Sequence, residues 1–547
     1  MSAPVLTARD AVGTRAADAP LQMTHKQILE ALGGLLLGLF VAILSSTVVS
    51  NALPRIISDL HGSQTAYTWV IAASLLATTA TTPIWGKLAD LTSKKLLVQL
   101  SLVIFVAGSA IAGLSQSTSM LIASRVVQGV GAGGLTALTQ VCMAVMITPR
   151  ERGRYSGYLG AVFALATVSG PLIGGVIVDT SWLGWRWTFY VGVPFAAAAI
   201  VILQKTLRLP TVKRENVKID WLGATLIIGA VSLLLVWVSL AGHDFGWGSW
   251  QTAAMVGGAI ALAAAAVLVE AKVSEPVIPL SLFRHRTIAL ATVGSLFIGV
   301  GLFGSTIFLS QYFQISRGNS PTKAGLMTMP LVLGLFVASL VSGRVITKTG
   351  RWKAWLVSGT LLLTSGFALL STLRVDTAYP QVALYMAMTG LGVGMSMQNL
   401  VLSVQNAVPI SQLGVASSTV AFFRTLGGAI GVSALGALLG SQVAAHTRSG
   451  LARIGAPTGA GGGGNQIPNL ASLPLPVRHV VEAAYGIAAG DIFLVAAPVA
   501  FLAFVAVVFI KEVPLRTSNA LPADAQPTTA QPTTAQPTTA QPTHLSA

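Results

Sequence analysis

Runs of about 20 apolar residues recur along almost the whole chain, and this repetition limits its fold more than any other feature. A helix of that length crosses the hydrocarbon core of a bilayer, which is about 30 Å thick. We place fourteen runs at residues 28–52, 66–86, 96–115, 119–145, 156–178, 187–205, 220–241, 252–270, 287–313, 324–346, 353–373, 381–404, 413–440 and 490–510. The sequence therefore predicts an all-α membrane protein with 14 transmembrane helices and no sizeable soluble domain.

Charge is scarce and unevenly placed. Only 9% of the 547 residues are charged, 53% are hydrophobic, and the mean hydropathy is +0.74. Soluble domains are about 25% charged. The net charge of +16 would suit a nucleic-acid partner, but the basic residues gather in alternate loops, as they do in cytoplasmic loops of membrane proteins. We therefore expect a multi-pass protein of the cell membrane with both termini in the cytoplasm and no nucleic-acid partner.

The spans and loops divide the chain into successive parts. These are a cytoplasmic tail (1–27), a six-helix bundle (28–206), two inserted helices (219–271), a second six-helix bundle (287–510) and a tail (511–547). The last tail repeats AQPTT, which cannot bury a core, so it is predicted to be disordered. Within the second bundle, 441–489 contains GAGGGG and LPLPV and is predicted to form a long irregular outer loop.

Three pairs of related strings show that the two bundles are repeats. GKLADLTSKK begins at Gly86 and GRVITKTGRWK at Gly343, 257 residues later. GVGAGG and GLGVGM begin 261 residues apart, and GPLIGG and GGAIGV begin 257 apart. Parallel repeats of six-helix bundles characterise one large class of transporters, whose substrate site lies near mid-membrane between the halves. Transport by alternating access is therefore the leading interpretation.

Five strings together resemble signatures of the major facilitator superfamily, in its fourteen-spanner drug:proton antiporter branch, over roughly residues 28–515. They are GKLADLTSKK, RVVQGVGAGG (125–134), GPLIGG (170–175), WRWTFYVGVP (185–194) and IDWLG (219–223). The resemblance implies a multidrug or antibiotic exporter that exchanges its substrate for protons. It assigns conformational roles to Gly86, Asp90, Lys94, Lys95, Gly170, Pro171, Gly174 and Gly175.

Two of these motifs have a physical interpretation of their own. Asp90 lies where a helix meets a basic loop, so its carboxylate can cap a helix N-terminus or pair with a lysine, and thereby latch one conformational state. The alternative is an acid exposed to solvent in a loop. Pro171 removes a helix hydrogen bond, and the glycines beside it leave a smooth face that allows bending, sliding or simple tight packing.

Intramembrane charge is the sharpest open question. Arg125 and Arg424 fall inside spans, where a lipid-facing guanidinium would cost at least about 2.5 kcal/mol, so both are expected to face the bundle interior. The family's first-helix motif carries an acid where this chain has Ser45, and none of the 17 acids is placed in mid-membrane. Arg125 then needs glutamine or backbone partners, a bound anion or an anionic substrate. Asp491, at the start of the last span, is the remaining coupling candidate if it dips toward Arg424.

The sequence thus predicts an exporter of amphipathic small molecules, with protons as the implied counter-ion. The alternatives are a dedicated lipid or metabolite exporter with different or no proton coupling, and a non-transporting membrane sensor or scaffold. Enzyme motifs such as GxSxG, HExxH and CxxC are absent from the sequence, and we expect no cofactor, no metal and a monomer. The candidate cavity residues, each also explicable by hydrogen bonding between helices, are Ser45, Ser46, Asn51, Gln128, Gln140, Gln311, Gln314, Asn399 and Gln405.

Overall fold

The computed structural model describes residues 24–61, 64–180, 182–207, 209, 220–241, 245–457 and 473–517. These segments form helices and a single isolated bridge between Ala241 and Phe245. Several helices start where the sequence supplies a cap. Ser117 accepts a hydrogen bond from the Met120 N–H at the start of one, and Ser249 caps another in the same way. The fold class predicted from the apolar runs, an all-α membrane bundle, is confirmed.

The first half contains seven helices. They are α1 (His25–Asp59), α2 (Gln64–Leu91), α3 (Lys94–Gly113), α4 (Thr118–Met146), α5 (Pro149–Asp179), α6 (Trp187–Tyr190) and α7 (Val193–Thr206). The short α6 and α7 together make one candidate span, Trp187–Thr206. The two inserted helices are α8 (Trp221–Leu240) and α9 (Trp250–Glu270), which pack against each other as a hairpin.

The second half begins with the 3₁₀ turn η1 (Leu280–Arg284) and ends beyond the last helix. Its elements are α10 (Arg286–Gln311), the π turn η2 (Tyr312–Ser316), α11 (Pro321–Met327), α12 (Met329–Thr349), α13 (Lys353–Leu370), α14 (Tyr379–Ala407), the 3₁₀ turn η3 (Ile410–Gln412), α15 (Leu413–Arg453) and α16 (Leu475–Val508). Gly350 ends α12 in the left-handed region with φ of 72°, which glycine adopts without strain.

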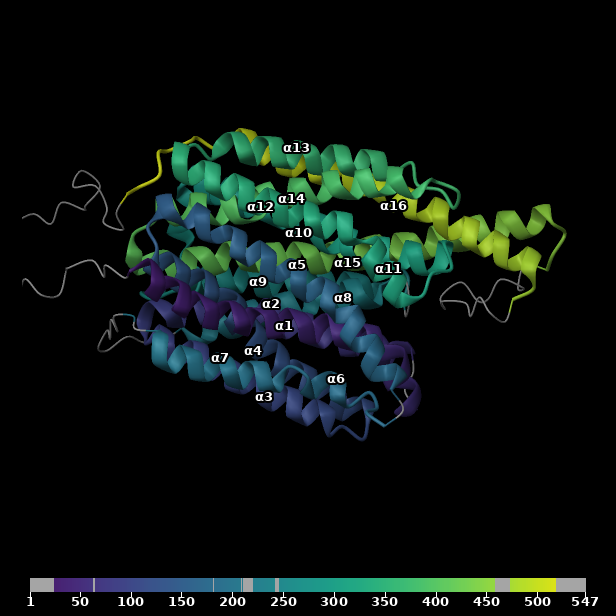
Figure 1. Cartoon of the computed structure of the whole chain (residues 1–547), viewed down its shortest axis with the longest axis horizontal. Coiled ribbons are helices and arrows are strands. Elements are labelled where there is room, and N and C mark those ends of the chain that lie inside the picture. The colour runs from purple at the N-terminus through teal and green to yellow at the C-terminus, as the bar shows by residue number, and fades with distance from the viewer. Residues whose placement is uncertain are drawn as a thin grey trace, which may run out of the picture.

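Helix packing repeats between the halves. α2 packs on α4 as α12 packs on α14, α3 on α4 as α13 on α14, and α1 on α5 as α10 on α15. Figure 1 places α3, α4, α6 and α7 on one side of the bundle and α12, α13, α14 and α16 on the other. The described chain starts and finishes at the same end of the bundle. The last turn of α2, which contains Asp90, lies at this end; we call it the Asp90 end, and the opposite one the Arg125 end.

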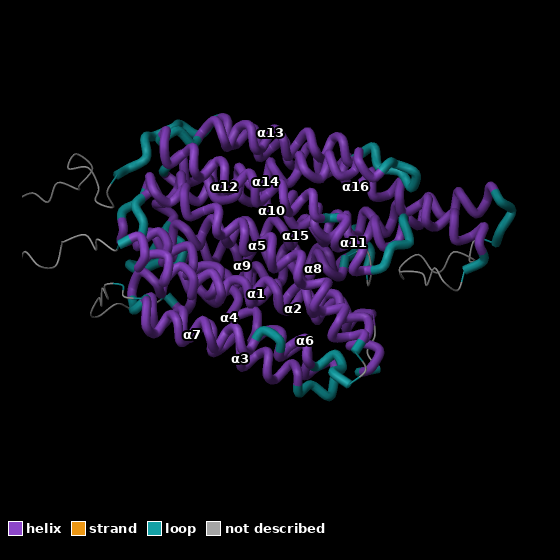
Figure 2. The backbone as a smooth tube through the Cα atoms, in the orientation of Figure 1, coloured by secondary structure: helices purple, strands orange, loops and turns teal. Residues whose placement is uncertain are grey.

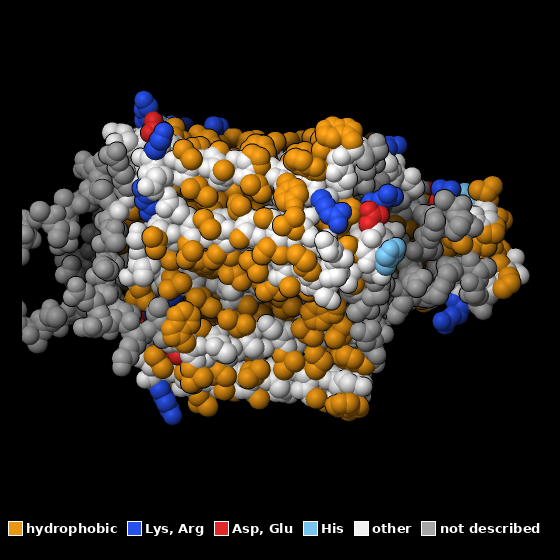
Figure 3. Space-filling view, turned by 90° about the horizontal axis from the view of Figure 1, so that it is seen from below, with side chains coloured by type: hydrophobic (Ala, Val, Ile, Leu, Met, Phe, Trp, Pro, Cys, Tyr) orange, Lys and Arg blue, Asp and Glu red, His pale blue; other side chains and the backbone are white. Residues whose placement is uncertain are grey.

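Twelve helical segments of the described chain are long and apolar enough to cross a membrane. α2 and α14 are missing from that set although they contain 28 and 29 residues. Both carry polar residues that are used inside the bundle, such as Thr78 of α2, which donates to the Gly129 carbonyl at 3.1 Å. Twelve of the 14 predicted spans are therefore supported by both length and apolarity, whereas α2 and α14 are supported by their length alone. Figure 3 shows apolar side chains over the middle of one long face and Lys and Arg toward its ends.

The irregular structure predicted for 441–489 is wrong at both ends of that stretch, and residues 458–472 lie outside the described part of the chain. α15 continues to Arg453 and α16 already begins at Leu475, so the two helices form a projection beyond the Arg125 end of the bundle (Figures 1 and 2). With 41 residues, α15 is about 61 Å long, twice the thickness of a hydrocarbon core. Its outer part pairs with α16, since His446 Nε2 lies 2.8 Å from Asp491 Oδ2. The prediction extended the irregular structure expected of the glycine-rich string to the sequence on either side of it, which is helical.

Candidate functional site

Arg125 is buried and bound by neutral groups. Its Nε donates to the Val70 carbonyl at 3.3 Å, and its Nη1 donates to Gln128 Oε1. Gln128 in turn donates from Nε2 to Ser45 Oγ at 2.9 Å and to Ser109 Oγ at 2.8 Å. Of the three explanations left open for Arg125, the structure matches the first, in which glutamine and backbone carbonyls take the place of the missing acid.

Arg424 lies buried on α15, and its Nη1 has no hydrogen-bond partner among the described residues. The expected approach of Asp491 to this arginine is wrong. Asp491 pairs with His446, which lies 22 residues after Arg424 and therefore about 33 Å further along the helix axis. This error and the error at 441–489 have the same source, because α15 and α16 both extend well beyond the predicted spans.

The two halves meet at the Asp90 end through α2 and α15. Asp90 Oδ1 accepts the Gly414 N–H at 2.8 Å, and Oδ2 accepts the Val415 N–H at 2.9 Å. These are N–H groups at the start of α15, where an acid is electrostatically favourable. A Cβ at Gly86 would overlap Ser418, so glycine is what permits this approach.

Asp90 lies four residues beyond the predicted span 66–86, in the last turn of α2. Burial raises the pKa of its carboxyl to about 7, although the two backbone hydrogen bonds, Lys94 and Lys87 all favour the charged form. The contact with α15 is therefore sensitive to protons near neutral pH.

A second contact between the halves joins α5 and α12 at the same end. A Cβ at Gly343 would overlap the Gly153 carbonyl oxygen, so the two backbones touch there. Arg152 is 1% exposed and bridges the halves by donating from Nη1 to Gln405 Oε1 on α14 at 3.1 Å. Arg516 adds contacts from its Nη2 to the Gln405 and Val408 carbonyls, and burial lowers the pKa of its guanidinium.

The other motif residues occupy different places. Lys94 starts α3, and Lys95 donates to the Gln204 carbonyl within its own half at 2.7 Å. At the opposite end of α5, Pro171 lies against α11 of the other half, where a Cβ at Gly325 would be 3.2 Å from it. Gly170 packs on Thr47 of α1, Gly175 faces Thr322 of α11 and Gly174 is buried. Helix α5 thus contacts the other half at both ends.

The predicted cavity residues lie in several different places in this arrangement of the helices. Gln140 donates to Gln398 Oε1 across the halves at 3.2 Å, and Asn399 donates to Ser342 Oγ within the second half at 3.4 Å. Ser45 and Gln128 belong to the Arg125 network, and Gln405 lies at the Asp90 end. Gln314 bonds Ser310 near the other end, and Gln311 is half-buried. Ser46 is exposed, and the side chain of Asn51 lies outside the described residues.

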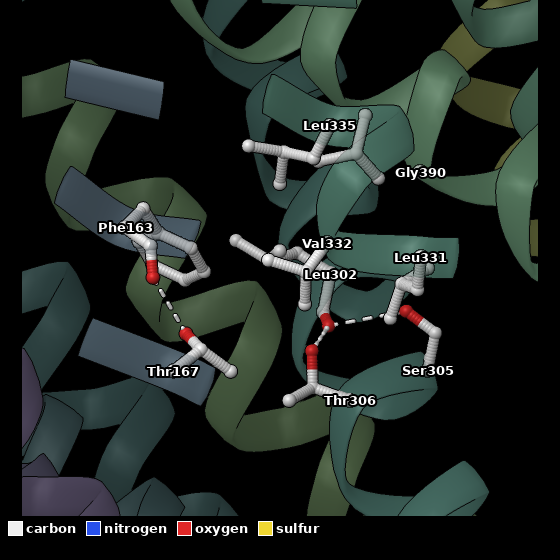
Figure 4. A pocket seen from close by; sticks show the side chains of 10 residues that line it. Phe163, Thr167, Leu302, Ser305, Thr306, Leu331, Val332, Leu335 and Gly390 are labelled. Atoms are coloured by element: carbon white, nitrogen blue, oxygen red, sulfur yellow. Dashed lines mark hydrogen bonds between the residues drawn. The ribbon is translucent and has the colours of Figure 1, made fainter. Parts of the chain in front are cut away.

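One small cavity lies between α5 and the second half (Figure 4). Phe163 and Thr167 face Leu302 and Val332 across it, and its volume of about 10 Å³ suits one water molecule. None of the predicted cavity residues is among its lining. The halves are therefore closely packed here and at the Asp90 end.

Sequence reasoning missed two contacts between distant parts of the chain. Arg152 was not among the candidate residues, although it shares a helical face with the small residues Gly153, Ser156 and Gly160, a pattern that could have indicated burial. Lys87 on α2 pairs with Glu275, which follows α9, at 2.5 Å between Nζ and Oε2. No local pattern predicts that pair, because the partners are 188 residues apart.

Comparison with known proteins decides the family. Residues 35–432 match the description "Major Facilitator Superfamily". The chain belongs to this superfamily. It is therefore a membrane transporter and not an enzyme, and a small molecule is its substrate.

Relatives within the superfamily include exporters. The chain is 34% identical over 410 residues to the multidrug transporter protein MdtP of Bacillus subtilis (strain 168), covering 75% of each chain. It is 33% identical over 411 residues to the efflux pump FUS6 of Gibberella moniliformis (strain M3125 / FGSC 7600), covering 74% of this chain and 72% of that one. Among solved structures, the proton:xylose symporter XylE aligns with a TM-score of 0.58 at 14% identity, over 89% of this chain and 96% of that one, which supports the fold alone.

Proposed function

We propose that the protein exports amphipathic small molecules across the cell membrane by alternating access, in exchange for protons, with its Asp90 end in the cytoplasm. The observation that carries the proposal is the pair of cross-half contacts, α2 with α15 and α5 with α12, at one end of a twofold repeat. Two bundles joined by separable contacts at one end can rock about a site between them. Closure at the Asp90 end directs the substrate path outward.

The motif residues then act as parts of this rocking joint. Asp90 and Gly86 hold α2 against α15, with Lys94 and Lys95 ordering the adjoining start of α3. The GPLIGG face of α5 meets α11 at the opposite end, so it is the surface over which α5 slides when the Asp90 end opens. Arg125 and Arg424 supply buried positive charge within the bundle.

The direction of transport and the kind of substrate are inferred from the relatives. MdtP is described as a multidrug transporter and FUS6 as an efflux pump, which supports export. A dedicated lipid or metabolite exporter with different or no proton coupling is the nearest alternative. A non-transporting sensor or scaffold would have no use for a separable contact such as that of Asp90.

The test is flux in proteoliposomes that contain the purified full chain, with an imposed pH gradient and a panel of cationic and anionic amphipathic dyes. We expect dye movement that collapses when the gradient is removed, and its loss in Gly343→Val. Dye movement without any response to the gradient would support the alternative exporter. If no dye or lipid probe moves under any gradient, while the protein remains folded and monomeric by size-exclusion chromatography, the export proposal is wrong.

A further inference from the structure

The inserted hairpin is not an isolated lipid-facing appendage. Side chains of α8, such as Val231 and Leu235, form one apolar cluster with Phe422 and Leu426 of α15 and with partly buried residues of α2, such as Ile84. The segment after α9 joins the same cluster through Val277 and Ile278. The hairpin therefore contacts the two helices that meet at Asp90.

Two acids lie buried at the root of this hairpin. Asp220 caps α8 by accepting the Gly223 N–H on Oδ1 at 2.8 Å, and it is 7% exposed. Glu270 ends α9, is 5% exposed, and accepts the Val277 and Ile278 N–H groups at 3.1 Å each. Asp220 Oδ2 has no partner among the described residues.

Gly223 shows that the two carboxyl groups converge. A Cβ added there would overlap Asp220 Oδ2 and stand 2.9 Å from Glu270 Oε1, so both oxygens border the same point. Two ionised carboxylates that border the same point repel each other, and a shared proton removes the repulsion. The unpartnered oxygen of Asp220 and an oxygen of Glu270 thus lie near the same point.

Among the described residues, the other charges around the pair are already engaged. Lys87 of α2 is the cation that acts on Glu270, but its ammonium group pairs with Glu275 at 2.5 Å. Asp90, one turn further along α2, is held by the α15 backbone. In this arrangement, with the Asp90 end closed, Lys87 shares its charge with Glu275, so it does not fully compensate two ionised acids.

We propose that Asp220 and Glu270 form a proton-binding site that holds one proton between Asp220 Oδ2 and Glu270 Oε1 while the Asp90 end is closed. This inference rests on the proposed alternating-access export and names a site for the proton that the mid-membrane region does not provide. When α2 moves away from the segment after α9, Lys87 is released from Glu275 and becomes free to compensate two ionised acids. The shared proton then leaves the pair for water at the Asp90 end, and both groups become carboxylates.

Infrared difference spectroscopy of the full chain in lipid nanodiscs tests the site directly, because a protonated carboxyl has its own carbonyl stretch. The titration runs from about pH 6.5 to about pH 9, a range in which exposed Asp and Glu are almost fully ionised. Asp90→Asn serves as the background for every sample, so that the Asp90 carboxyl does not contribute. We expect one protonated carboxyl per chain at neutral pH.

The variants separate a bound proton from a merely structural pair. Asp220→Asn and Glu270→Gln should each abolish the neutral-pH signal, whereas Glu30→Gln, which changes an exposed acid of α1, should leave it unchanged. Glu275→Gln should shift the loss of the signal to lower pH, since Lys87 then turns toward the pair. A wild-type spectrum without the signal, or one that both pair variants leave intact, overturns the proposal. The spectrum needs no substrate, so failed export in proteoliposomes would not imitate either result.

Discussion

The two cross-half contacts at the Asp90 end are related by the internal repeat, yet they are built differently. Gly86 and Gly343 are equivalent, and each lets its helix touch the other half. At α2 and α15 the first N–H groups of α15 have no acid in their own first turn, and Asp90 supplies it from across the boundary. The position 257 residues after Asp90 is Thr347, which bonds only its own helix through its hydroxyl.

The α5 contact needs no acid from the other half, because α5 provides its own. Glu151 lies in its first turn, and the Arg152 and Glu151 N–H groups both bond the Thr148 carbonyl at 3.0 Å. Packing and the Arg152 bridge hold this side instead. The difference indicates that protonation regulates one contact while steric fit sets the other.

Gly343→Val should have the largest effect, because a side chain there collides with backbone that cannot move aside. Overpacking costs about 1–3 kcal/mol, so closure of α5 on α12 should weaken by roughly 10- to 100-fold. The reporter is alkylation of Ser339→Cys by a charged maleimide in a Cys142→Ser background, since Ser339 is 3% exposed beside Gly160. Gly440→Val is the matched control, because nothing lies within 4 Å of a Cβ there. Equal labelling in both variants would contradict the steric account.

Asp90→Ala should come next. It leaves the Gly414 and Val415 N–H groups unpaired in a buried place, at a cost of about 1–3 kcal/mol, so opening of α2 from α15 should rise roughly tenfold or more. Ser418→Cys is the reporter on this side, since Ser418 is fully buried against Gly86. Labelling of Ser339→Cys should rise less, because the α5 contact keeps its own partners. If both reporters respond equally, the two contacts are one unit. Glu30→Ala controls for loss of an acid.

The α2 contact should also depend on pH, with a change of roughly tenfold or more in Ser418→Cys labelling. The pKa of Asp90 is about 7 in the contact and has its ordinary value of 3.8 when the carboxyl is released, so the closed state binds a proton that the open state gives up. Closure is therefore favoured at low pH. It weakens as the pH rises from the pKa of the released carboxyl, 3.8, through the pKa in the contact, about 7. Labelling corrected for reagent reactivity should rise between about pH 5 and about pH 8. The α5 reporter should show a flat profile over this range. In Asp90→Ala the rise should shrink to the part that release of the proton from Asp220 and Glu270 contributes.

The sequence predicted the fold and the α2 side of the contact between α2 and α15. Apolar runs and equal offsets identified the repeat, and the loop motif singled out Gly86 and Asp90. The partner of Asp90 could not be found that way, since a backbone N–H carries no residue signature and Gly414 is 324 residues distant. Arg152 looked like an ordinary loop arginine because its burial depends on α14. Ser45 showed that the usual acid is missing near Arg125 but left three explanations for that arginine open. Helix length beyond the membrane, and hence the place of Asp491, has no hydropathy signal.

Thr347→Asp should have the smallest effect, and it sharpens the comparison most. The variant places an acid at the position equivalent to Asp90, facing the start of α5. Pro149 has no N–H there, the Arg150 N–H bonds the Arg516 carbonyl at 3.2 Å, and the next two N–H groups bond Thr148. An added carboxylate finds no free backbone donor, so Ser339→Cys labelling should change less than about twofold, the size of a surface ion pair with Arg150. A tenfold fall in labelling would mean that the α5 terminus accepts a cap as α15 does, and that the acid alone distinguishes the two sides of the joint.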